Sequence, residues 1–132
     1  MLKVEHIGIA VRSLETSIPL FQRLQNSDCY KKETVESEAV QTAFFHQGDT
    51  KIELLEATNP GSTIAKFVDK KGEGIHHIAF EVADIYAEME RLKGEGFTLL
   101  QTVPKQGADN KLVCFLHPKD TNGVLIELCQ EI

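Results

Sequence analysis

The chain has 132 residues, of which 42% are hydrophobic and 26% are charged, and its formal net charge is −6 at pH 7. This size and balance are typical of a single globular domain with a buried core. The acidic balance argues against nucleic acid or an anionic membrane as the main partner. No apolar stretch approaches a membrane span, and the first residues lack a signal-peptide layout, so we expect a cytoplasmic protein.

The first half predicts a strand, a helix and three more strands. A β-branched run at about 2–11 gives the first strand, and Ser13 is a suitable N-cap for a helix at about 14–25. Pro19 lies inside this helix, which therefore should start late or kink. The helix has an apolar stripe of Leu14, Ile18, Phe21 and Leu24. Strands are expected near 28–36, 39–47 and 50–57, with Gly48-Asp49 as the last turn.

The second half repeats this order after a connector at about 58–73, which holds a short helix from Thr63 to Lys70. It predicts a strand at about 75–82, Asp84 as an N-cap and a helix at about 85–94. Further strands are expected near 96–103, 111–117 and 123–130. We therefore predict an α+β fold for residues 1–132. It is one domain of two tandem βαβββ modules, about 1–57 and about 74–132, which form a cupped mixed β-sheet with the helices on its outer face.

Histidines and acids occur at matching places in the two halves. His6 opens a β-branched run in the first half, and His77 opens a similar run in the second. Glu53 and Glu127 each lie inside an apolar strand near the end of their half. A buried carboxylate without a partner is costly, so these two acids are hard to explain as structural residues. Two imidazoles and two carboxylates that converge would form a divalent metal site.

Strand alternation agrees with this site, although a one-residue register error would invert any strand. It places small residues beside each histidine and apolar residues on the opposite face, under the helix. His76 should point away from His77, as a structural or supporting residue, and Glu5 is expected to be a solvated or paired charge. Cys129 could share a face with Glu127. The three cysteines are odd in number and lack C-x-x-C spacing, which argues against a disulfide framework.

Several stretches carry a resemblance to a known family: residues 48–56, 64–67, 71–82, 116–120 and 123–128. In this order they resemble the vicinal oxygen chelate (glyoxalase/bleomycin-resistance/dioxygenase) superfamily, and most closely its methylmalonyl-CoA epimerases. The resemblance covers nearly the whole chain. It implies a glyoxalase-like fold and an acyl-CoA substrate. Because dimers are common in that superfamily, it also implies a homodimer.

By this resemblance, His6, His77 and Glu127 match the family's metal ligands, and Glu53 matches a fourth position that is glutamine in some epimerases. The implied cofactor is a divalent cobalt, manganese or zinc ion. The implied reaction is R/S interconversion of methylmalonyl-CoA at C2 through a metal-stabilised enolate. Glu127 matches a residue with both ligand and acid/base duty. A second glutamate of several epimerases is Thr42 here, and a water held by Thr42 or Gln41 could replace it.

Lys105 and Lys119 could meet the phosphates of CoA. Three other functions remain open for the same pattern. Glyoxalase I (lactoylglutathione lyase) would use the same ligand set. A metal-free drug-binding resistance module needs none of the four ligands. A ring-cleaving dioxygenase would need Fe(II) at a site of two histidines and one carboxylate.

Overall fold

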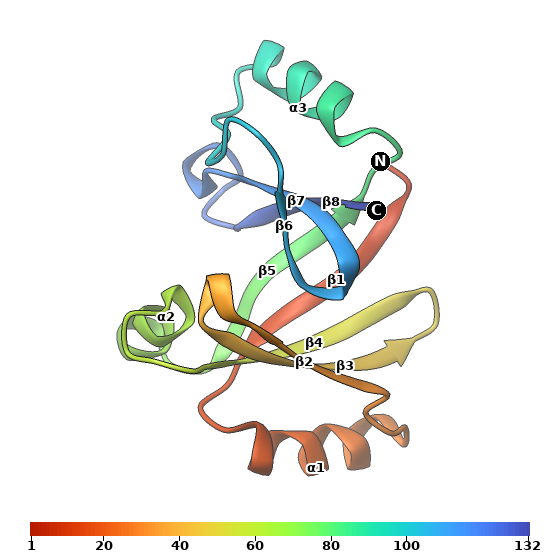
Figure 1. Ribbon diagram of the computed structural model, residues 1–132, viewed down its shortest axis with the longest axis vertical. Helices are drawn as coiled ribbons and strands as arrows, with labels where there is room; N and C mark the ends of the chain where they lie inside the picture. The colour runs from red at the N-terminus through yellow and green to blue at the C-terminus, as the bar shows by residue number, and fades with distance from the viewer. The chain divides into compact units, whose positions relative to one another are not determined.

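The computed structural model describes all residues 1–132 (Figure 1). Its strands are β1 (Lys3–Ala10), β2 (Lys31–Val35), β3 (Val40–Gln47), β4 (Thr50–Ala57), β5 (Gly74–Glu81), β6 (Lys105–Gln106), β7 (Lys111–Leu116) and β8 (Ile126–Glu131). The helices are α1 (Leu14–Gln25), α2 (Thr63–Lys71) and α3 (Ile85–Gly94), with short 3₁₀ turns η1 (Glu36–Glu38), η2 (Ala108–Asn110) and η3 (Pro118–Asp120). None of the helices combines the length and apolarity that crossing a lipid bilayer requires.

The chain forms two compact units. Unit 1 comprises Met1–His6 and His77–Ile132, and unit 2 comprises Ile7–His76. Strands β1 and β5 therefore each give residues to both units. The predicted modules and connector follow the repeat in the sequence and are not the same division as these two units. They stay a prediction.

Unit 2 is built on the strand order β2-β3-β4-β1, with antiparallel pairing from β2 to β4. Gly48 adopts a positive φ of 62° in the tight turn between β3 and β4, a conformation that glycine adopts without strain. Helix α1 packs on one face of this sheet, where Leu14, Phe45 and Leu54 are buried together. Helix α2 packs Ile64 against Leu55 in a second cluster.

Unit 1 has the strand order β1-β5-β8-β7-β6, in which β5 and β8 are parallel and the pairs after them are antiparallel. Helix α3 covers one face of this sheet (Figure 1). Its residues Ile85, Met89 and Leu92 are buried against Cys114 of β7 and Leu128 of β8. The sheet's other face carries a smaller cluster around Ala79, Val113 and Cys129.

The two halves of the repeat contain equivalent backbone hydrogen bonds. In unit 2 the N–H of Val11 donates to the carbonyl of Leu55, at 2.9 Å. In unit 1 the N–H of Val82 donates to the carbonyl of Cys129, also at 2.9 Å. Each donor follows the histidine of its own half by five positions, and each acceptor follows the acid of its own half by two.

Helices α1 and α3 are also capped in the same way. Ser13 and Asp84 accept hydrogen bonds as N-caps of α1 and α3, as predicted. The first helical N–H of α1, at Leu14, donates to Glu56 Oε1 of β4 at 2.6 Å. The first N–H of α3 donates to Gln130 Oε1 of β8 at 2.7 Å. Each capping side chain stands three residues after the acid of its own half.

Glu53 and Glu127 are three positions further apart in the sequence than His6 and His77 are. The three extra positions can be located by comparing the strand pairs of the two units. Val40 pairs with Ala57 in unit 2, and Lys111 pairs with Glu131 in unit 1, so the shorter spacing continues through β7. The longer spacing begins only with β8. The extra positions therefore lie in the connection between β7 and β8, where η3 replaces the tight turn that contains Gly48.

Two sequence predictions about strands were wrong. Residues 96–103 form no strand, and only Leu99 makes an isolated bridge, with Leu116. A side chain interrupts the ladder here, because the Phe115 N–H donates to Gln101 Oε1 at 2.7 Å. The last strand begins at Ile126 rather than near residue 123, since the preceding residues form a turn.

The predicted disturbance at Pro19 was also wrong in one respect, because α1 begins at Leu14 without delay. Pro19 is exposed, so the carbonyl that its missing N–H leaves without a helical donor can bond to water. Leu24 of the expected apolar stripe is 72% exposed and takes no part in the core.

Candidate metal centre

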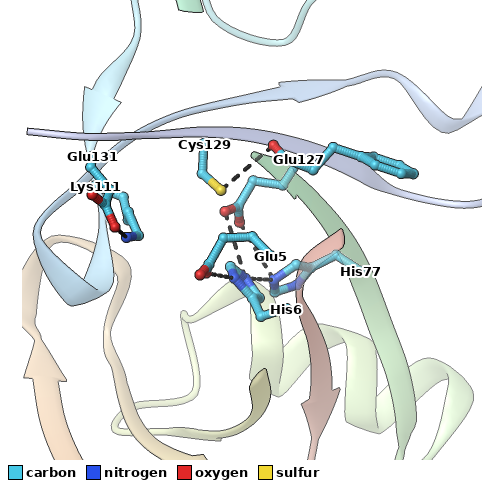
Figure 2. Close-up of polar contacts among 8 residues, drawn as sticks. Glu5, His6, His77, Lys111, Glu127, Cys129 and Glu131 are labelled. Atoms are coloured by element: carbon cyan, nitrogen blue, oxygen red, sulfur yellow. Dashed lines mark hydrogen bonds and ion pairs between the residues drawn. The ribbon is translucent and has the colours of Figure 1, made fainter. Parts of the chain in front are cut away.

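Three predicted ligands lie together in unit 1: His6 from β1, His77 from β5 and Glu127 from β8 (Figure 2). The Nε2 atoms of the two histidines are 3.0 Å apart. Glu127 Oε2 is 3.6 Å from His6 Nε2, and Glu127 Oε1 is 3.4 Å from His77 Nε2. All three side chains are buried, with at most 6% of any residue exposed.

These distances fit a shared cation. Two ligand atoms held about 2.1 Å from one ion are about 3.0 Å apart at an octahedral right angle and about 3.4 Å apart at a tetrahedral angle. The observed separations of 3.0, 3.4 and 3.6 Å need little adjustment to reach either geometry. Imidazole nitrogen with carboxylate oxygen is a donor set that suits zinc and neighbouring divalent metals.

The pairing of the strands explains this convergence. In the parallel pair of β5 and β8, Glu127 lies beside Ala79, a small and fully buried residue two positions after His77. The N-terminal end of β1 is joined to β5 by the hydrogen bond from the Leu2 N–H to the Glu81 carbonyl. Phe115, the partner of Glu127 on β7, meets the His77 ring edge-on at 5.9 Å.

Glu5 is a residue of this centre that the sequence analysis missed. We expected a solvated or paired charge, and Glu5 is paired, because its Oε1 lies 2.8 Å from His6 Nδ1. It is not solvated, since only 2% of the residue is exposed. Alternation alone would send Glu5 and His6 to opposite faces, yet both are buried. An acid directly before a candidate ligand in a β-branched strand was the available signal.

Cys129 also reaches the centre. Glu5, His6 and Cys129 each offer an atom within ligand distance of the others. The Cys129 thiol donates to the carbonyl of Phe80 at 3.6 Å. Burial raises the pKa of this thiol well above its usual value, and the nearby carboxylates of Glu127 and Glu5 raise it further. The side chain is therefore a neutral thiol at physiological pH.

A buried lysine, on which the sequence analysis made no prediction, lies on the same face of the sheet. Lys111 is 5% exposed, and its Nζ lies 3.2 Å from Glu131 Oε1 (Figure 2). The register of β7 with β8 places Lys111, Glu131 and Cys129 on one face.

The two lysines predicted to bind phosphate lie in different surroundings. Lys105 is half-buried, with its Nζ 5.9 Å from the centroid of the Phe115 ring, which in turn contacts His77. Lys119 is exposed in η3, where its backbone N–H donates to His117 Nδ1 at 3.0 Å. Phosphate binding by either lysine stays a prediction.

The other two predicted site residues belong to unit 2. Glu53 on β4 is 3% exposed, and Thr42 on β3 is fully buried. Thr42 pairs with Leu55 and Glu53 pairs with Phe44, so the side chains of Thr42 and Glu53 share one face of that sheet. The Thr42 hydroxyl donates to the carbonyl of Glu33 at 3.3 Å. Their roles in binding and catalysis stay predictions.

The His76 ring meets Phe67 of α2 edge-on at 5.0 Å. This packing contact fits the structural alternative of the two roles expected for His76.

Comparison with known proteins adds the family. Residues 5–115 match the glyoxalase/bleomycin resistance protein/dioxygenase superfamily. The chain is 41% identical to the ethylmalonyl-CoA/methylmalonyl-CoA epimerase of Cereibacter sphaeroides over 130 residues, covering 97% of each chain. It also resembles a variant of Streptomyces coelicolor methylmalonyl-CoA epimerase in complex with 2-nitronate-propionyl-CoA, with a TM-score of 0.95 and 32% identity over 99% of this chain and 95% of that one.

A second solved structure, of a methylmalonyl-CoA epimerase in complex with methylmalonyl-CoA and NH4+, gives the same TM-score of 0.95, at 32% identity over 99% of this chain and 95% of the other. These likenesses confirm the predicted glyoxalase-like α+β fold. With a family match over most of its length and relatives that align nearly from end to end, the chain belongs to the glyoxalase/bleomycin resistance protein/dioxygenase superfamily.

Proposed function

We propose that this chain is a metal-dependent isomerase that interconverts the R and S forms of methylmalonyl-CoA at C2. The observation that supports this most is the buried cluster of His6, His77 and Glu127, whose three donors fit one divalent cation. The relatives named methylmalonyl-CoA epimerase support the choice of substrate.

The chemistry of the substrate suits such a centre. The hydrogen at C2 lies between a thioester and a carboxylate, and its removal leaves an enolate whose negative charge makes up most of the barrier. A cobalt, manganese or zinc ion would supply Lewis-acid stabilisation of that charge. His6, His77 and Glu127 would hold the ion. We include Glu53 as the fourth ligand because it is the repeat counterpart of Glu127.

Proton transfer falls to the side chains. Glu127 would remove or return the C2 proton on one face, in addition to its ligand role. For the opposite face we propose a water molecule held by Thr42 or Gln41. The Thr42 hydroxyl donates its hydrogen to the Glu33 carbonyl, so its oxygen would act as an acceptor toward that water.

Lys105 and Lys119 are the proposed contacts for the CoA phosphates. The proximity of Lys105 to Phe115, and of Phe115 to His77, favours Lys105 over the exposed Lys119. We also propose a homodimer, which light scattering on the purified chain would test.

The test is proton NMR of methylmalonyl-CoA in D2O with metal-loaded protein. We expect solvent deuterium at C2 and equilibration of the two epimers, both of which should stop when a chelator removes the metal. Absence of exchange, together with turnover of the glutathione hemithioacetal of methylglyoxal, would instead identify a glyoxalase I.

A matched pair of variants on β8 assigns the activity to the centre. Glu127→Gln removes the buried carboxylate and should abolish exchange. Glu131→Gln removes an acid four residues further along the same strand, whose side chain is 74% exposed, and should leave exchange intact. Equal activity in the two variants would contradict the proposed role of Glu127.

A further inference from the structure

The side chain that precedes His6 is bonded to it. Glu5 Oε1 lies 2.8 Å from His6 Nδ1, and only 2% of Glu5 and 6% of His6 are exposed. A carboxylate so enclosed is costly unless it accepts hydrogen bonds. The contact with the imidazole N–H is therefore a charge-assisted hydrogen bond, which is stronger than a neutral one.

This bond decides which nitrogen of His6 carries the hydrogen. A neutral imidazole has one N–H, and a carboxylate can only accept, so the hydrogen lies on Nδ1. The lone pair is then on Nε2, the atom that lies 3.0 Å from His77 Nε2 and 3.6 Å from Glu127 Oε2. A cation shared by these residues needs that lone pair.

The same reasoning assigns a tautomer to His77 in protein treated with a chelator. Because His6 Nε2 is an acceptor, the hydrogen in the 3.0 Å contact between the two Nε2 atoms comes from His77. The two histidines then have opposite tautomers. Loading of a cation would move the hydrogen of His77 to its Nδ1 and would leave His6 as it was.

The fold itself does not require an acid at position 5. By the spacing that relates His6 to His77, the counterpart of Glu5 is His76, whose ring packs against Phe67. The second copy therefore builds the equivalent strand with a different residue type and a different partner. An acid at this position is therefore particular to the first copy, where its carboxylate is bonded to His6.

We propose that Glu5 is a positioning residue of the metal centre, which holds His6 in the orientation and tautomer that present Nε2 to the cation. The proposal rests on the metal-binding function proposed above. Loss of such an outer carboxylate typically costs 10- to 100-fold in metal affinity. We therefore expect a loss of about that size for Glu5→Ala and a smaller loss for Glu5→Gln, whose amide oxygen accepts without charge.

The first measurement needs no metal. Two-bond 1H–15N correlation spectra of chelator-treated protein report which ring nitrogen carries the hydrogen. Wild type should show it on Nδ1 of His6 and on Nε2 of His77, Glu5→Asp should keep this pattern, and Glu5→Ala should lose it. A wild-type His6 with its hydrogen on Nε2 overturns the proposal.

The second measurement is calorimetric and spectroscopic titration with Co²⁺ of wild type, Glu5→Ala, Glu5→Gln and the control Glu131→Gln. Weaker binding in the two Glu5 variants alone supports the proposal. Equal affinity in all four proteins refutes the positioning role of Glu5 but not the metal centre. Two ions per chain, or a cobalt–thiolate absorption band that Cys129→Ser removes, would instead make Glu5, His6 and Cys129 a second site. A wild type that binds no cation refutes the metal centre as well.

Discussion

The acceptor that β4 provides to helix α1 gives the sharpest stability prediction. Glu56 Oε1 accepts the first helical N–H, at Leu14, over 2.6 Å, and Leu14 is 3% exposed. Substitution by alanine leaves this N–H without a side-chain acceptor. Loss of a capping acceptor costs about 0.5–2 kcal/mol. Loss of the negative charge at the positive end of the helix dipole adds about 0.3–1 kcal/mol.

For Glu56→Ala we therefore expect the free energy of unfolding to fall by about 1–3 kcal/mol. With an unfolding entropy of roughly 2.1 cal/mol/K per residue, each 1 kcal/mol lowers the Tm of a chain of this length by about 3.6 °C. The expected drop is about 4–11 °C, measured by calorimetry and checked by urea unfolding.

Glu56→Gln is the matched control, because the second copy already uses glutamine at the equivalent place, where Gln130 accepts the first N–H of α3. It keeps the acceptor and should lose only the dipole part, about 0.3–1 kcal/mol. Gln130→Ala should cost about 0.5–2 kcal/mol. The reasoning is refuted if Glu56→Ala melts with the same Tm as wild type, or if the alanine and glutamine variants at position 56 melt together.

Three further outcomes are expected. Thr42→Val should lower the rate of epimerisation in the D2O assay by tenfold or more. An unchanged rate would refute the proposal that Thr42 holds the water that transfers the proton. In native protein at pH 8, a thiol reagent should modify the half-exposed Cys29 quickly, while Cys114 and Cys129 react only after unfolding, because burial raises the pKa of both thiols; modification of all three at one rate would contradict this. A backbone N–H donates to the Asp120 carboxylate and lowers its pKa. The stabilisation is therefore full above about pH 4 and is lost as the pH falls through the lower folded value. Asp120→Asn should weaken the fall of Tm between pH 6 and pH 2, and a Tm profile identical to wild type would count against it.

The repeated pattern made much of the fold predictable. Ser13 and Asp84 marked the starts of α1 and α3 correctly, because a short polar side chain before an apolar periodic run is a strong local signal. Residues 96–103 failed because their contacts with β7 are made partly by the side chain of Gln101. The strand propensity of a segment does not indicate that one of its side chains will take the place of a backbone acceptor.

The repeat made part of the candidate site predictable. It matched His6 with His77 and Glu53 with Glu127, and the structure brings His6, His77 and Glu127 together. The role of Glu53 stays a prediction. Glu5 and Lys111 have no such mark, since their burial depends on which strands lie beside them. Strand order comes from tertiary pairing, which the sequence of a single chain reveals only in part.

The contact between the two Nε2 atoms bears on how the proposed cation would be acquired. His6 and His77 can form a hydrogen bond with each other. The N–H in this contact therefore does not remain an unsatisfied buried donor when no ion is bound. Folding of the chain and binding of the proposed ion would then be separate events. The geometry of the centre would exist before the ion arrives, and the supply of ions in the cell would decide which one binds.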